Sequence, residues 1–169
     1  AENLVRALVD DINSVINSGK SESAMYRDFE RLFERYADVP TIARFTLGVD
    51  ARRASSAQLR AWTDAYSRRI ATTYGSRFRE FIGGRLEVQQ TRALPRSNRT
   101  DYEVRTTAFL RGEDPFEVTF LVSDASGRPT FYNAFIEGVN MLLSERTEIG
   151  AMLDARGGDI DALIRAVGG

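Results

Sequence analysis

The sequence predicts a single α+β domain over residues 1–169, in which helices flank a curved, four-stranded antiparallel sheet. Apolar side chains recur every three or four residues up to residue 82, which is the spacing of a buried helix face. The period changes to two between residues 86 and 137, which is typical of strands. Because only short turns separate these strands, we expect neighbouring strands to pair antiparallel.

The first three helical segments have recognisable ends. A helix over residues 3–18 ends at Gly19, and a second helix begins after Ser21 and ends before Pro40. One further turn of helix ends at Gly48. Each segment presents one apolar face, so we expect all three to pack against the rest of the domain.

The fourth helix is the longest and begins at a capping box, in which Gln58 is placed to reach back to Ser55. At ~1.5 Å per residue, residues 56–82 would extend over roughly 40 Å, with a bend at Gly75 and an end at Gly83. The apolar stripe of this helix either lines a ligand cavity or packs in the core, since both fit the same spacing. The stripe consists of Leu59, Trp62, Tyr66, Ile70, Tyr74, Phe78 and Phe81.

Four strands follow, beginning near residues 86, 100, 116 and 130. Bulky apolar residues stand on both faces of the last strands, so either both faces are covered or one face lines a cavity. In the second strand Asp101 alternates with Tyr102 and falls on the polar face. Helices over residues 139–155 and 159–167 complete the chain. A sheet wrapped by the long helix would form a cone with an internal apolar cavity.

The composition excludes most common hydrolytic and redox chemistry. The chain has 23 basic and 24 acidic side chains but neither His nor Cys. It therefore cannot form a Ser-His-Asp triad, a thiolate nucleophile or a Cys/His zinc site. We expect no cofactor and no metal, and these absences favour a binding protein over an enzyme.

The basic side chains are concentrated in the middle of the chain. Residues 42–111 hold 14 basic and 6 acidic side chains, and Lys20 is the single lysine of the protein. Such a surplus suits anionic lipid, nucleic acid or an acidic partner, but the arginines are scattered, which favours a solvated face. We do not expect nucleic acid as a partner, because the glycine-rich and aromatic RNA-binding signatures are absent. No apolar stretch approaches the ~20 residues that span a bilayer.

The segment from Phe131 to Asn140, with its Ile-Glu-Gly sequence, resembles the end of the last strand in the MlaC (toluene-tolerance) family. It departs from the family pattern at Pro129, Asn133 and Asn140, where the family has Trp, Asp and Ser. Further pieces stand in the family's order and extend the resemblance over most of the chain. They are Phe45-Thr46-Leu47-Gly48, Arg53-Ala54-Ser55, Arg146 and Gly158-Asp159-Ile160-Asp161-Ala162-Leu163-Ile164.

The resemblance implies a periplasmic phospholipid shuttle that maintains the lipid asymmetry of the outer membrane. Its implied partners are a phospholipid, an outer-membrane lipoprotein–porin complex, and an inner-membrane ABC transporter complex with a membrane-anchored lipid-binding subunit. The acyl chains would lie in the apolar cavity, with the head group near solvent. Because the chain opens at Ala1 rather than Met, we expect a mature or trimmed form from which a targeting segment is missing.

We predict that inward-facing apolar residues of the long helix, the sheet and the junction at Gly138 bind the lipid, although plain core packing fits each of them equally well. They are Leu47, Trp62, Tyr66, Ile70, Tyr74, Val104, Phe120, Ile136, Val139, Met141 and Leu142. By the resemblance, Arg146 would bind a carboxylate or the head-group side. A salt bridge from Arg146 to Glu137 or Glu145 is the structural alternative.

Two other classes of function remain open. A small enzyme with a similar cone fold would use a buried Asp–Tyr acid–base pair on a hydrophobic substrate. The residues available for this are Asp64, Tyr66, Asp101 and Tyr102. The position of Asp101 on the polar face argues against such a pair. An adaptor that binds only protein partners would instead have a filled core and no cavity.

Overall fold

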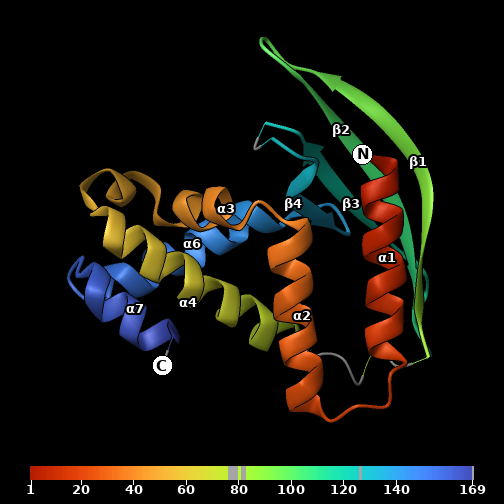
Figure 1. The fold of residues 1–169 in the computed structure, drawn as a ribbon, viewed down its shortest axis with the longest axis horizontal. Coiled ribbons are helices and arrows are strands. Elements are labelled where there is room, and N and C mark those ends of the chain that lie inside the picture. Colours follow the sequence, from red (N-terminus) through yellow and green to blue (C-terminus); the bar gives the residue numbers. More distant parts are fainter. Residues whose placement is uncertain (76–79, 81–82, 126, 169) are drawn as a thin grey trace.

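The computed structural model describes residues 1–75, 80, 83–125 and 127–168 (Figure 1). Helices come first along the chain, then a sheet, then helices again, as the sequence predicts. The N-terminal part consists of α1 (Glu2–Ile16), α2 (Glu22–Tyr36), α3 (Val39–Leu47), the 3₁₀ helix η1 (Gly48–Arg53) and α4 (Ser56–Gly75). The remainder consists of β1 (Arg85–Pro95), β2 (Thr100–Phe109), β3 (Phe116–Ser123), β4 (Thr130–Ile136), β5 (Val139–Asn140), α6 (Met141–Asp154) and α7 (Ile160–Gly168).

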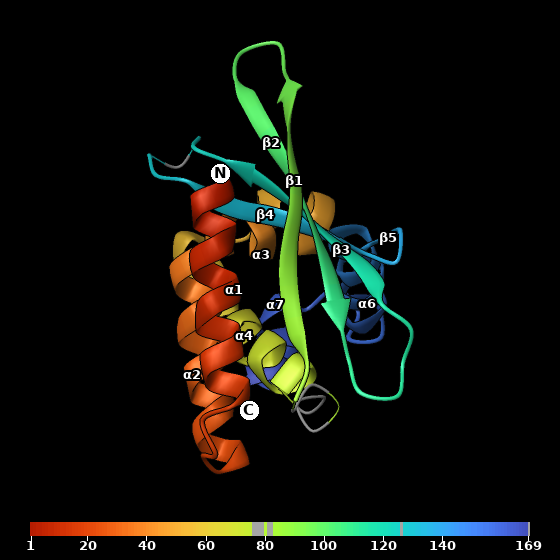
Figure 2. The same ribbon diagram turned by 90° about the vertical axis from the view of Figure 1, so that its right-hand side faces the viewer.

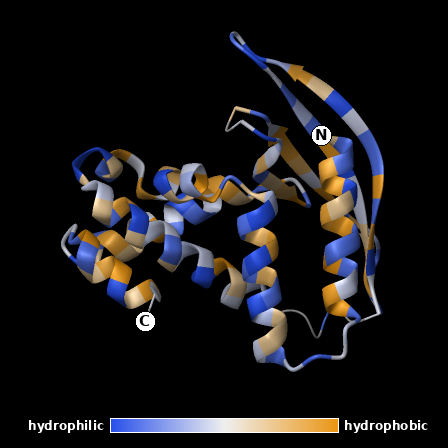
Figure 3. Ribbon diagram, in the orientation of Figure 1, coloured by the Kyte–Doolittle hydropathy of each residue, from blue (hydrophilic) through white to orange (hydrophobic). Residues whose placement is uncertain are grey.

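Helices α2 and α3 each begin at a side-chain cap. The hydroxyl of Ser21 accepts a hydrogen bond from the backbone N–H of Ala24 at the start of α2. At the start of α3, the carboxylate of Asp38 accepts one from the N–H of Thr41. In Figure 3 hydrophobic and hydrophilic residues alternate along α1 and α2, as expected of helices with one buried face.

The predicted capping box of α4 is present. The backbone N–H of Ser55 donates to Oε1 of Gln58 at 2.9 Å, and the N–H of Gln58 donates to Oγ of Ser55 at 3.0 Å. At Gly75 the helix lies against the ring of Tyr26 on α2, where a Cβ atom would come within 2.5 Å of the ring. Only glycine allows this close approach of α2 and α4. The predicted continuation of the helix to residue 82, with Phe78 and Phe81, lies outside the described residues.

The strands form an antiparallel meander in the order β1-β2-β3-β4-β5. Val139 and Asn140 do not belong to the helix predicted over residues 139–155 but form the short fifth strand. Glu137 and Gly138 both have positive φ, 51° and 81°, and this tight turn folds the chain back so that Val139 pairs with Ile136. Helix α6 begins only after Asn140, whose side chain accepts a hydrogen bond from the N–H of Leu143 at 3.1 Å.

The described helices lie on one side of the sheet, and Figure 2 shows the other face uncovered in front of them. Helix α1 packs on the inner face, where Val5 and Leu8 join a core cluster with Val104 and Phe120. The outer face carries ion pairs, among them Arg92–Glu103 at 2.8 Å. Among the described residues the sheet is therefore not covered on both faces, which leaves the second arrangement that the sequence allowed, in which one face lines a cavity.

A second core cluster lies between α3, α4, α6 and α7. Trp62 and Tyr66 on α4 are its largest fully buried residues, and Ile149 on α6 packs in the same cluster with Leu153 and Leu163. Among the described residues, no helix is both long enough and apolar enough to cross a membrane. The described residues thus form two large apolar clusters, one under the sheet and one between the helices, and a smaller third one around Ile16 and Met25.

Candidate functional site

A cavity of about 640 Å³ lies between the two core clusters. Its wall combines residues of the sheet-side cluster, such as Leu8 and Phe120, with residues of the helical cluster, such as Ile42 and Tyr66. Most of the wall is apolar. The apolar lining residues are Leu8, Ile12, Ile16, Phe29, Leu32, Phe33, Ile42, Ile70, Ala71, Leu86, Ala108, Leu110, Phe116, Val118, Phe120, Phe131, Ala134, Ile136, Val139, Met141 and Leu142.

Eight of the residues predicted to bind lipid lie on this wall. They come from α4, the sheet and α6, and the fold brings them around one space. They are Tyr66, Ile70, Tyr74, Phe120, Ile136, Val139, Met141 and Leu142. Their role in binding a lipid stays a prediction.

Three predicted residues, Leu47, Trp62 and Val104, lie outside the cavity wall. Trp62 is fully buried in the helical cluster, and its Nε1 donates to the backbone oxygen of Ala43 at 2.9 Å. Leu47 belongs to the same cluster, whereas Val104 packs in the sheet-side cluster with residues of α1. The apolar stripe of α4 is therefore divided. Trp62 packs in the helical core, whereas the C-terminal part of the stripe faces the cavity.

Helices α1 and α2 also contribute to the wall, which the sequence does not predict. Their lining residues are Leu8, Ile12, Ile16, Phe29, Leu32 and Phe33. The amphipathic stripes of both helices are visible in the sequence, but a stripe shows only that a face is buried. It does not show whether that face meets side chains or an open space.

A buried carboxylate interrupts the apolar wall. Glu145 is only 7% exposed, and its Oε1 accepts a hydrogen bond from the hydroxyl of Tyr66 at 3.0 Å. Nε of Arg69 lies 3.7 Å from the same oxygen. Burial raises the pKa of Glu145, and the nearby Arg69 and the Tyr66 hydrogen bond only partly offset it. Burial, together with the Glu145 charge, also raises the pKa of Tyr66, so its hydroxyl remains a hydrogen-bond donor.

Arg146 forms neither of the salt bridges considered from the sequence, as far as the described residues show. Its guanidinium lies 4.9 Å from the ring centroid of Phe45 and packs closely against Gly48. Gly48 has a φ of 61°, and a Cβ there would come within 3.2 Å of the guanidinium. The predicted Leu-Gly turn and Arg146 therefore fit together as a packing unit between α3 and α6.

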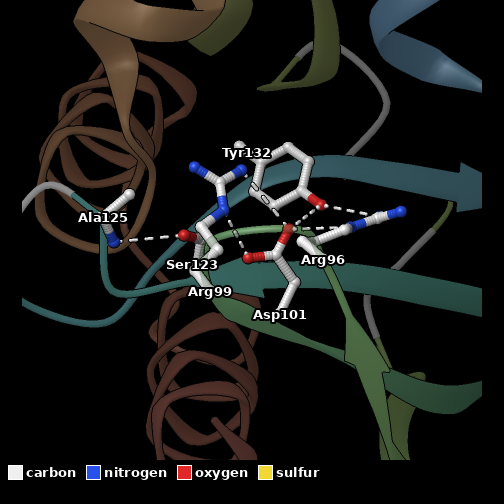
Figure 4. A network of polar contacts seen from close by, with 6 residues as sticks. All are labelled: Arg96, Arg99, Asp101, Ser123, Ala125 and Tyr132. Atoms are coloured by element: carbon white, nitrogen blue, oxygen red, sulfur yellow. Dashed lines mark hydrogen bonds and ion pairs between the residues drawn. The ribbon is translucent and has the colours of Figure 1, made fainter.

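Asp101 lies on the outer face of the sheet, as predicted, but it is fully buried rather than solvated (Figure 4). Its carboxylate accepts hydrogen bonds from the Tyr132 hydroxyl at 2.8 Å and from Nε of Arg99 at 2.9 Å and of Arg96 at 3.3 Å. Burial alone would raise the pKa of Asp101, but these three donors outweigh it and lower the pKa. The carboxylate is therefore ionised near neutral pH and already paired, which makes it a weak proton acceptor.

Among the described residues, no hydrogen bond joins Asp64 or Asp101 to Tyr66 or Tyr102. Asp64 is exposed on α4 while Tyr66 is buried beside Glu145, and Asp101 bonds Tyr132 rather than Tyr102. Asp101 is not part of the cavity wall. The part of the chain that the structure describes contains no cluster of acidic side chains able to hold a metal ion.

The family model described as MlaC protein matches residues 6–168 of this sequence. The chain belongs to the MlaC family. The resemblance seen in the segment from Phe131 to Asn140 is thereby confirmed. A search of the curated proteins found no match.

Seven solved chains match the MlaC-family fold of this protein. One of them is described as the phospholipid-binding protein from Ralstonia solanacearum in complex with a phospholipid. It is 19% identical, with a TM-score of 0.82, and the match covers 99% of this chain and 94% of that chain. At this identity the likeness establishes the fold.

Two departures from the MlaC family pattern contact each other. Nδ2 of Asn133 on β4 donates to Oδ1 of Asn140 at 2.9 Å, and Oδ1 of Asn133 accepts from the N–H of Leu142 at 3.0 Å. Asn140 also caps α6. The two asparagines, which stand where the resemblance has Asp and Ser, therefore form a pair that fixes the start of α6 beside the cavity.

Proposed function

We propose that the cavity binds the acyl chains of a phospholipid. The observation that carries this proposal is the apolar wall around about 640 Å³, formed jointly by the sheet and by helices from both ends of the chain. Burial of each CH₂ group contributes about 0.8 kcal/mol, so one long acyl chain in such a space gains on the order of 10 kcal/mol. The phospholipid complex of the Ralstonia solanacearum protein, which shares the fold, supports the same occupant here.

In this proposal the protein is a periplasmic carrier. It moves a phospholipid between an outer-membrane lipoprotein–porin complex and an inner-membrane ABC transporter complex with its membrane-anchored lipid-binding subunit. Membership of the MlaC family supports this role. A carrier must also release its cargo, and a lipid held by apolar contacts is released without breaking a covalent bond.

The enzyme alternative has less support. Asp101 is ionised, paired with two arginines and outside the cavity wall, so it has no access to a hydrophobic substrate held there. Glu145 and Tyr66 do line the cavity, but they bond each other. A protein adaptor with a filled core does not fit a molecule that contains this cavity.

A vesicle-loading assay tests the proposal. Delipidated protein is incubated with phospholipid vesicles and separated from them, and the bound lipid is extracted and quantified per folded molecule. In Ile70→Glu an unpaired carboxylate enters the apolar wall, so bound lipid should fall at least about tenfold. The control is Val49→Glu, at a position 71% exposed and outside the wall, which should load normally. Undiminished loading of Ile70→Glu, with its fold verified by circular dichroism, would contradict the proposal.

A further inference from the structure

Three large apolar side chains are exposed around the start of α6. Val139 on β5 is 52% exposed, Leu143 on α6 is 54% exposed and Phe45 on α3 is 36% exposed. Val139 also lines the cavity, so the exposed apolar surface begins at the cavity wall. Exposed apolar side chains that gather beside polar ones are typical of surfaces that contact a membrane or another protein.

Helix α6 brings these side chains together. Strand β5 leads directly into α6 and lies beside it (Figure 2), with Val139 four positions before Leu143. Leu143 and Arg146 are three positions apart on α6 and therefore share one face of the helix. The guanidinium of Arg146 lies 4.9 Å from the ring centroid of Phe45, next to the exposed Arg44. These five residues form what we term the rim surface.

The arginines of the rim surface carry positive charge that the protein does not neutralise. In the described part of the chain, Arg44 and Arg146 form no ion pair. On α6, Glu148 is bound to Nη2 of Arg69 at 2.9 Å. Glu137, which is exposed in the turn before the rim surface, is outnumbered by the two arginines. A guanidinium without a carboxylate partner is well suited to bind a phosphate through paired hydrogen bonds.

We propose that the rim surface docks onto the head-group region of a phospholipid bilayer. Arg44 and Arg146 bind lipid phosphates, while Leu143 and its apolar neighbours enter the interface to a shallow depth. The choice of a bilayer rests on the proposed function, because a bilayer is the source of the lipid that the cavity takes up. Since the apolar surface begins at the cavity wall, an acyl chain passes from the bilayer to the cavity with little exposure to water.

Flotation with vesicles tests the docking. The full chain is mixed with vesicles of phosphatidylcholine that contain phosphatidylglycerol as a minor lipid, and the share of protein that floats with them is measured. In Arg44→Glu/Leu143→Glu a cation is reversed and an apolar contact becomes a carboxylate, so vesicle binding should fall at least about tenfold. Leu143 lies in the first turn of α6 after the cap at Asn140, where a glutamate favours the helix, so the variant should fold.

The matched control is Arg27→Glu/Tyr102→Glu, which changes the net charge by the same amount. Both side chains are exposed, on α2 and β2, and both lie outside the rim surface and the cavity wall. Because salt screens charges that are not in contact with the bilayer, vesicle binding of the control should stay within about twofold of the wild type.

The outcomes separate the docking from the function on which it rests. A wild type that acquires lipid but does not float with vesicles, as expected if the rim surface binds a protein instead, would overturn the docking and leave lipid binding intact. Undiminished flotation of Arg44→Glu/Leu143→Glu, or an equally large fall in the control, would also overturn it. Failure of the wild type to acquire lipid is measured separately, by extraction, and would overturn the proposed function.

Discussion

The hydroxyl of Tyr66 on α4 donates a 3.0 Å hydrogen bond to Oε1 of Glu145 on α6, and both side chains line the cavity. This bond joins the long helix to a helix nearly 80 positions later in the chain. It also places a polar pair in a wall that is otherwise largely apolar. One carboxylate thus both joins two helices and lines the cavity.

The pH dependence of stability should report the burial of Glu145. Its pKa in the folded protein is raised above 4.5, so ionisation costs more in the folded than in the unfolded state. Its contribution is therefore most favourable below about pH 4.5 and is lost as pH rises through the raised pKa. We expect the free energy of unfolding of the lipid-free wild type, measured by urea unfolding, to fall between pH 4 and pH 8 relative to that of Glu145→Gln. A wild type whose free energy of unfolding stays constant or rises relative to that of the variant over this range would contradict the prediction.

Trp62 should affect stability without affecting lipid binding. In Trp62→Phe the hydrogen bond to the backbone oxygen of Ala43 is lost inside the helical core, which should lower the free energy of unfolding by about 1–3 kcal/mol. Because Trp62 lies outside the cavity wall, lipid bound per folded molecule should equal that of the wild type. Denaturant unfolding and the vesicle-loading assay measure the two quantities. A loss of loading comparable to that of Ile70→Glu would place Trp62 in the site after all.

Asn133 and Asn140 should be energetically coupled. In the wild type, Nδ2 of Asn133 donates to Oδ1 of Asn140 at 2.9 Å. In Asn133→Asp alone, a carboxylate oxygen would replace this donor and face the acceptor oxygen of Asn140, which is unfavourable. Adding Asn140→Ser supplies a hydroxyl donor and retains a residue that caps helices well. The double variant should therefore be more stable than Asn133→Asp, with a coupling energy of about 0.5–3 kcal/mol in a double-mutant cycle. If the changes in the free energy of unfolding caused by the two substitutions are additive, the two side chains are not energetically coupled, which would contradict the prediction.

The sequence predicted much of the fold because local signals suffice for it. Alternation from residue 86 onward predicted the meander, and Ser55 with Gln58 marked the start of α4. The sequence predicts a junction at Gly138, but the brief return of the chain as β5 depends on pairing with β4, which no local pattern reveals.

The cavity wall was harder to predict than the fold. Periodicity shows that a face is buried but not what it is buried against, which is why Trp62 and Val104 were grouped with Ile70 and Phe120. The Asp101 network was missed for a related reason. Alternation placed Asp101 on the outer face, but its burial depends on Tyr132, 31 positions away in the sequence.

Native mass spectrometry of the gently purified full chain, before and after organic extraction, tests the central claim most directly. If the cavity binds phospholipid, the untreated protein should show an added mass in the range of one or more phospholipids. This mass should disappear on extraction and return after incubation with vesicles. A protein that carries no added mass as purified, and acquires none from vesicles while remaining folded, would contradict the account.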